Sequence, residues 1–160
     1  MADFPILGID LSLGFTADEE GRTVAGPFSQ VDLQAVRHSR VLPPQVDLDI
    51  ASGKENLVQS LIVRLLTERG ELAPLGHPNY GSRHHELIGQ PNTEANRNLV
   101  KLYILECVKQ ERRIESVLKI DVKPGFGREN RDKVDVDMSL QIRGVPDPLN
   151  LVLPFSFAGP

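Results

Sequence analysis

The chain has 160 residues, of which 40% are hydrophobic and 25% charged, and its net charge is −4. This length suits one domain that buries roughly 70% of its unfolded surface. Because the pI is about 5.6, we do not expect a broad nucleic-acid-binding surface. The single cysteine, Cys107, excludes an internal disulfide and fits a reducing cytoplasm. The first residues lack a basic segment and no apolar run reaches the roughly 20 residues that cross a bilayer, so neither a secretory signal nor membrane insertion is expected.

The chain is predicted to divide into an N-terminal arm of residues 1–46 and an α+β domain of residues 47–160. Near this boundary Val46, Leu48 and Ile50 alternate with aspartates, which is typical of a short strand. The domain is therefore expected to start with a strand that leads into its first helix.

The first helix is predicted to begin at Ser52, because Ser52 and Glu55 have the three-residue spacing of a capping box. From residue 57 to residue 66, apolar side chains recur at helical spacing and form a wide stripe. Gly70 lies where a left-handed C-terminal cap is expected. A loop rich in proline and glycine follows, and residues 83–88 are predicted to form a short helix that a glycine closes.

A long helix is predicted from about Asn92 to Glu111. Its apolar residues occupy more than half of the circumference, and such a helix has to be covered on more than one side. We expect the first helix and a sheet to cover one side. The other side is expected to meet either the N-terminal arm or a separate chain.

Three runs of alternating apolar and polar residues follow, at residues 118–123, 134–142 and 149–157. Period-two patterning with one buried face indicates an antiparallel sheet that packs on helices. The predicted fold class is therefore α+β, with helices packed on a small antiparallel sheet of three or more strands. Because Pro154 cannot donate to a strand ladder, the last strand is expected to lie at a sheet edge there.

His77, His84, His85 and Glu86 form the one cluster with metal-ligand chemistry. Adjacent histidines on a helix point about 100° apart, so His84 and His85 cannot both face one ion without strain. No second histidine pair or matching cysteine follows downstream. We therefore expect no metal and no cofactor.

Paired carboxylates could indicate glycoside hydrolysis, which needs two carboxyl groups across a cleft, one with a raised pKa. The candidates are Glu71 or Glu86 together with Glu106 or Glu111. Nothing in the sequence groups them, and two tyrosines and six phenylalanines leave a sugar-stacking platform unsupported. No Gly-x-Ser-x-Gly elbow is present either. We predict no catalytic residues and a chain that is not an enzyme.

Glu111 and Arg113 fall where the long helix stops and the next strand starts, beside the apolar Ile114. One interpretation is a solvated helix end, where the helix dipole favours cations. The other is that both charges are buried between chains, and each then needs a partner because an unpaired buried charge is very costly.

From Leu48 to Phe155 the chain resembles the baseplate wedge and sheath-initiator proteins of contractile tails. These occur in myophages, type VI secretion baseplates and extracellular contractile injection particles, and some members carry the name tail lysozyme. The resemblance is carried by the helix Asn56–Leu66, the loop residues Leu66–Glu71 and Leu75–Ser82, the helix start Asn92–Arg97, and Glu111, Arg113 and Ile114. The family pattern at the helix end is Glu-Pro-Arg followed by Ile or Val, and Arg112 stands here in place of the proline.

The resemblance implies a structural baseplate component whose helices join a bundle with wedge proteins and whose sheet shares strands with sheath subunits. The strands near Val134–Ile142 or Leu149–Phe157 would then accept or donate sheath strands. Glu111, Arg113 and Ile114 are the predicted partner-binding residues.

The implied partners are the sheath protein and the wedge proteins, with tube or spike-hub proteins as further candidates. The symmetry of contractile baseplates implies multiple copies, about six in each particle. The implied location is the bacterial cytoplasm during assembly and the baseplate of the finished particle.

Two alternatives stay open. A hydrolase acting on peptidoglycan would use Glu71 and Glu86, although no residue pattern supports that activity. A soluble regulatory adaptor is the other alternative, because a stress-response anti-adaptor protein uses the same fold.

Overall fold

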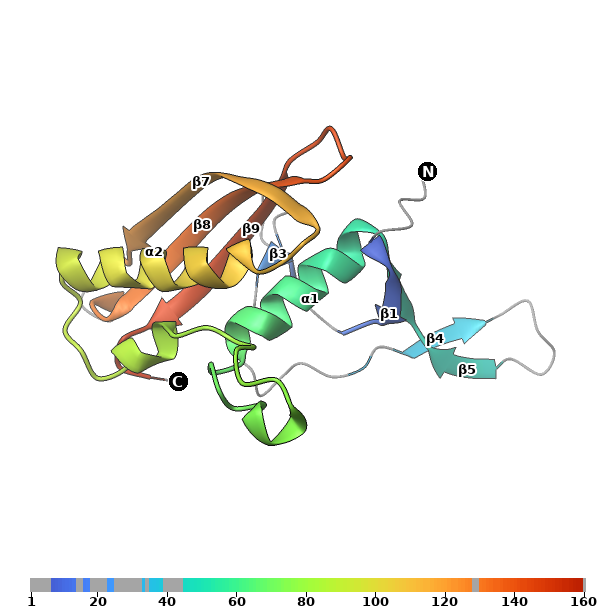
Figure 1. The fold of residues 1–160 in the computed structure, drawn as a ribbon, viewed down its shortest axis with the longest axis horizontal. Coiled ribbons are helices and arrows are strands. Elements are labelled where there is room, and N and C mark those ends of the chain that lie inside the picture. The colour runs from blue at the N-terminus through green and yellow to red at the C-terminus, as the bar shows by residue number, and fades with distance from the viewer. Residues whose placement is uncertain are drawn as a thin grey trace.

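The structure is a computed structural model. It describes residues 7–13, 16–17, 23–24, 33, 35–38, 45–127 and 130–159. In these residues two α-helices lie against a five-stranded sheet (Figure 1).

The main sheet has the strand order β2-β3-β9-β8-β7. Its strands are β2 (Thr16–Ala17), β3 (Thr23–Val24), β7 (Ile114–Pro124), β8 (Lys133–Ile142) and β9 (Leu149–Ser156). β7, β8 and β9 pair antiparallel, while β3 runs parallel to β9. This confirms the predicted α+β class with its antiparallel sheet, which two short N-terminal strands extend.

Two smaller sheets involve the N-terminal part of the chain. β1 (Ile9–Leu11) pairs with β6 (Ile50–Ser52), and β4 (Ala35–His38) pairs with β5 (Gln45–Leu48). The β4–β5 hairpin projects from the body of the molecule (Figure 1). The division of the chain at residue 46 stays a prediction, although strands from both sides of it pair with each other.

The core lies between the main sheet and the helices α1 (Lys54–Leu66) and α2 (Glu94–Lys109). α2 lies along β7, and α1 lies nearer to β9 (Figure 1). Every second residue of β8, from Val134 to Ile142, is buried against the helices. The removal of this apolar surface from water is the main term that stabilises the arrangement.

The ends of α1 differ from the prediction. The N-cap is Gly53, with φ 61° and no side-chain cap, because Ser52 is held in β6. The predicted capping box is therefore wrong. At the other end, Thr67 donates both its N–H and its hydroxyl to the Val63 carbonyl, at 3.0 and 2.8 Å. The helix closes there, so the left-handed Gly70 (φ 95°) belongs to the next turn and not to the cap.

The long helix α2 begins as predicted, with the Thr93 hydroxyl accepting the Asn96 N–H at 3.2 Å. Its buried residues are Val100, Ile104, Cys107 and Val108. Leu99 and Leu102 stay 37% and 47% exposed, so the described residues do not cover the outer side of α2. Neither α2 nor another helix in the described ranges has the length and hydropathy to cross a bilayer.

β7 departs from simple alternation. Its pairing with β8 shifts register between Val117 and Lys119, which marks a β-bulge. Leu118, predicted on the buried face together with Ile120, is 56% exposed. The prediction for Leu118 is wrong, because the bulge turns this side chain to the other face of the strand.

Candidate protein-binding interface

The corner between α2 and β7 brings the three predicted partner-binding residues into one turn. The Ile114 N–H donates to the Glu111 carbonyl at 3.1 Å, and the Arg113 carbonyl accepts the Arg143 N–H at 2.9 Å. Arg143 directly follows β8, so the turn is tied to the sheet. Arg112 lies between Glu111 and Arg113 in this corner and is exposed.

Glu111 and Arg113 form a salt bridge with two contacts at this corner. Arg113 Nε lies 2.8 Å from Glu111 Oε1, and Arg113 Nη2 lies 3.0 Å from Oε2. The backbone N–H of Arg113 also donates to Oε1 at 3.3 Å. A further guanidinium nitrogen donates to the Leu7 carbonyl at 3.2 Å, and Arg64 Nη2 lies 3.9 Å from Glu111 Oε2.

These contacts keep Glu111 ionised although it is only 8% exposed. Burial alone would raise the pKa of Glu111. The hydrogen bonds and charge of Arg113, with the more distant Arg64, outweigh burial and hold the pKa below its ordinary value. The carboxylate therefore accepts hydrogen bonds and has no proton to donate at neutral pH.

The charges of this corner are satisfied within the chain itself. Ile114 is 8% exposed and belongs to the core. The corner thus joins α2, β7 and the N-terminal segment around Leu7. Its predicted contact with a partner chain stays a prediction.

The loop after α1 packs back on that helix. The Arg64 guanidinium lies 4.5 Å from the centre of the Tyr80 ring. Gly81 has φ 99°, and a Cβ there would lie 2.6 Å from the Thr67 carbonyl oxygen, so a side chain cannot fit. Arg64 therefore connects this loop with the Glu111 carboxylate.

The histidine cluster is structural in the described part of the chain. The short helix η4 (His84–Leu87) forms as predicted, and His84 is 2% exposed with Nδ1 2.8 Å from the Ser82 hydroxyl. Burial, then the adjacent His85, lowers the pKa of His84 to about 3. His85 Nε2 lies 3.0 Å from the Leu65 carbonyl. No group of ligating side chains among the described residues is suited to hold a metal ion.

The carboxylates considered for hydrolysis are held by local contacts. Exposed Glu86 pairs with Arg83 at 2.9 and 3.0 Å, and the hydrogen bond from Arg83 lowers the pKa of Glu86. Exposed Glu71 accepts the Glu68 N–H at 3.2 Å. A glycosidase acid needs a raised pKa, and Glu86 shifts the other way.

The two outer strands of the main sheet, as far as the structure describes it, are β2 and β7. β7 is the longer one and offers a free edge. No strand in the described residues pairs with the outer side of β7. β8 lies between β9 and β7 and pairs with both, so the expectation that β8 could accept a strand at an edge is wrong. β9 lies between β8 and β3, and its pairing with β3 covers Leu151 and Val152. No strand of the described residues pairs with Pro154 on that side, and the expectation of a sheet edge at Pro154 stays a prediction.

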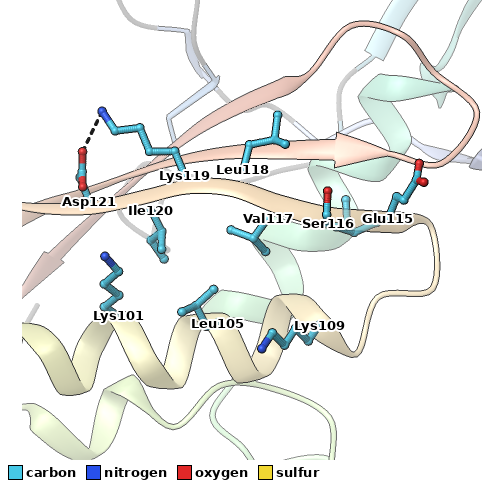
Figure 2. Close-up of a pocket in the computed structure, with 11 residues that line it drawn as sticks. Lys101, Leu105, Lys109, Glu115, Ser116, Val117, Leu118, Lys119, Ile120 and Asp121 are labelled. Carbon is cyan, nitrogen blue, oxygen red and sulfur yellow. Dashed lines mark ion pairs between the residues drawn. The ribbon is translucent and has the colours of Figure 1, made fainter.

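A groove of about 690 Å³ runs between the free edge of β7 and helix α2 (Figure 2). Val117 and Ile120 point toward α2, whereas Leu118 and Lys119 point away from it (Figure 2). The lining residues are Lys101, Leu105 and Lys109 from α2, and the continuous run Ile114–Asp121 from the corner and β7. The groove therefore exposes the strand's backbone edge beside a helix wall.

Sequence reasoning did not find this groove. The nearest signal is the spacing of Lys101, Leu105 and Lys109, which places them in one row along α2. The row forms a groove because β7 lies beside it. The alternation of side chains does not predict the order of strands in a sheet.

No protein-family model and no curated protein matches the chain. Four chains of solved structure match, among them the crystal structure of a "putative tail lysozyme" from Geobacter sulfurreducens. The two proteins are 23% identical with a TM-score of 0.57, and the match covers 66% of this chain and 92% of the other. At this identity the likeness shows a shared fold, and fold alone does not define activity.

Proposed function

We propose that the chain is a structural component of the baseplate of a contractile phage tail or injection particle. In this proposal its sheet pairs with a strand from a sheath subunit, and its helices join wedge proteins. The observation that carries the proposal is the free edge of β7 beside an open groove. The likeness to a protein named as a tail lysozyme supports the tail setting.

The edge of β7 is suited to bind a strand. An edge strand presents N–H and C=O groups that have no partner in its own sheet, and an added strand satisfies them. β7 has 11 residues, long enough for an extended segment of a neighbouring chain. Strand pairing repeated from subunit to subunit would pass the geometry of the first sheath ring to the next.

The outer side of α2 supports the helical half of the proposal. Leu99 and Leu102 are exposed on neighbouring turns, and helices of wedge proteins would cover them. Arg113 keeps its side chain 21% exposed beside the buried Glu111, so a partner could touch it without breaking the salt bridge. The sheath, the wedge proteins and tube or spike-hub proteins are the proposed partners, in several copies per baseplate.

Replacing Leu118 with proline tests this function. The β7–β8 register gives Leu118 no partner, so proline there should obstruct the free edge with limited damage to the sheet. Cells that make the particles should then produce few or no sheathed particles, scored by negative-stain electron microscopy. Leu118→Ala is the matched control and should assemble normally. Sheathed particles of normal length from a folded Leu118→Pro protein would contradict the proposal, and circular dichroism verifies the fold.

A peptidoglycan hydrolase is the second candidate, favoured by the name of the Geobacter sulfurreducens protein alone. The contacts of Glu71 and Glu86 do not resemble a raised-pKa acid facing a second carboxylate. A muramidase assay on the purified protein decides between the two functions. Turnover that Glu71→Gln or Glu86→Gln abolishes would replace our proposal. The regulatory-adaptor alternative stays a prediction, since no contact among the described residues favours it.

A further inference from the structure

We infer that the α2–β7 groove selects an extended segment of another protein that carries an acidic, an apolar and an acidic residue at every second position. This inference rests on the proposed strand pairing at β7 and adds the chemistry of the incoming strand. It follows from the geometry of the helix wall, from its charge and from the sequence of this chain.

The first step is the match of repeat lengths. Lys101, Leu105 and Lys109 are four residues apart along α2, so successive side chains are about 6 Å apart along the axis. Side chains on one face of a strand are about 6.6 Å apart. β7 runs along α2 in Figure 2, so a strand added to β7 also follows the helix. Three successive side chains on the face of the added strand that is turned toward α2 would then contact Lys101, Leu105 and Lys109 in turn.

The second step is charge. Among the described residues, no ion pair engages Lys101 or Lys109. Lys119 already pairs with Asp121 at 2.8 Å, and Glu115 points away from α2 (Figure 2). The helix wall thus offers two separated cations, and acidic side chains on the incoming strand would complement them.

The third step is the apolar centre. Leu105 is partly buried and packs against the core beside Val117, and both face the groove between the two lysines. An apolar side chain between the two acids would cover this centre, whereas a charged one would lose its hydration there. The face of the incoming strand that is turned toward α2 should therefore carry an acidic, an apolar and an acidic residue in succession. This order is the same in either strand direction.

The fourth step excludes a second copy of this chain as the occupant. The whole sequence has one pair of acidic residues four positions apart, Glu111 and Glu115, and Arg113 stands between them. That pair also lies at the corner between α2 and β7, and Glu115 itself lines the groove. The segment must come from a different protein.

Synthetic seven-residue peptides test the inference by NMR titration of the isotope-labelled full-length protein. The probe is acetyl-Thr-Glu-Thr-Val-Thr-Glu-Thr-amide. One comparison peptide has lysine in place of both glutamates, and the other exchanges the glutamates with the valine. The first peptide should shift the amide signals of β7 and bind about tenfold more tightly than either comparison peptide, with an advantage over the lysine peptide that fades in high salt.

The charge-reversed protein Lys101→Glu/Lys109→Glu should exchange this preference and bind the lysine peptide instead. Lys54→Glu/Lys133→Glu carries the same change in charge outside the groove and should keep the original preference. Equal binding of all three peptides, or no shift of β7 signals with the first, overturns the inference.

The two proposals fail in different experiments. If the peptide binds β7 with the stated preference but Leu118→Pro particles carry normal sheaths, the groove selects acidic strands and the sheath function is wrong. If the peptides show no preference while Leu118→Pro blocks assembly, the sheath function stands and this selectivity is wrong.

Discussion

The carboxylate of Glu111 is nearly removed from water, and one neighbour keeps it ionised. Arg113 reaches it from both its guanidinium and its backbone, while Arg64 stands farther off at 3.9 Å. Loss of the nearest cation leaves a buried negative charge with weak compensation. The same guanidinium also donates to the Leu7 carbonyl, so loss of Arg113 also removes a hydrogen bond to the N-terminal segment.

Arg113→Ala is therefore expected to lower the free energy of unfolding by about 2–4 kcal/mol, as for removal of one partner of a largely buried pair. Urea denaturation of the purified protein measures it. Arg112→Ala is the matched control, because Arg112 is exposed, and it should stay within about 0.5 kcal/mol of the parent protein. Equal stability of the two variants would show that the salt bridge adds nothing net.

Buried His84 predicts a loss of stability in mild acid. In the folded protein its pKa is about 3, against 6.5 for the free side chain, so the folded state stays neutral while the unfolded chain takes up a proton. Stability is complete above pH 6.5 and falls as the pH drops toward 3. Between pH 7.5 and 5.0 the loss from His84 should be about 2 kcal/mol.

Urea denaturation at these two pH values checks the size of the loss. His84→Asn should be less sensitive to pH, whereas His77→Asn, at an exposed position, should behave as the parent protein does. Glu111, with its lowered pKa, weakens the fold only at more acidic pH, below its ordinary value of 4.5. A parent protein equally stable at pH 7.5 and 5.0 would contradict the buried, neutral state of His84.

Sequence position was enough to place Glu111 and Arg113 in one turn, since they flank the end of a helix that periodicity predicts. It was not enough to predict that His84 is buried. That burial depends on Phe155, which lies more than 70 residues away in the chain and packs its ring 5.2 Å from the imidazole centre. A local pattern therefore placed the charged corner and missed the buried histidine.

At the scale of elements, the two helix starts provide a matched test of capping. Thr93→Ala should destabilise the protein by about 1 kcal/mol, because its hydroxyl accepts the Asn96 N–H at the start of α2. Ser52→Ala should change stability by less than about 0.5 kcal/mol, because Ser52 is exposed in β6 and caps nothing. Thermal unfolding followed by circular dichroism compares them. A larger loss from Ser52→Ala would restore the capping box that the sequence spacing suggests.

Among the strands, the alternation of apolar and polar residues predicts some features and not others. Alternation predicted β8 and β9 to within a residue or two at each end, because one face of each is buried along its whole length. It failed at Leu118, where one extra residue in β7 reverses the face without changing the spacing of apolar residues. Alternation also did not predict which strand lies at the sheet edge, because the order of pairing depends on contacts between distant segments.

At the scale of the whole molecule, the N-terminal residues complete the core. Leu7 is fully buried, and its carbonyl accepts hydrogen bonds from the Asn56 side chain at 2.7 Å and from Arg113 at 3.2 Å. Asn56 in α1 and Arg113 at the α2–β7 corner are distant in the chain, and both donate to the carbonyl of this one N-terminal residue. The sequence predicted an arm here, because short apolar runs broken by glycine carry no clear period.

Leu7→Ala is therefore expected to destabilise the protein by about 2–5 kcal/mol, through lost burial and the cavity left in the core. Ile9→Ala, two residues away in β1, removes a side chain that is 70% exposed and should cost less than about 1 kcal/mol. Urea denaturation of both variants measures the contrast. Similar costs would mean that residues before β1 act as a detachable arm. A large cost at Leu7 alone would mean that the domain folds only when this segment closes over α1 and the α2–β7 corner.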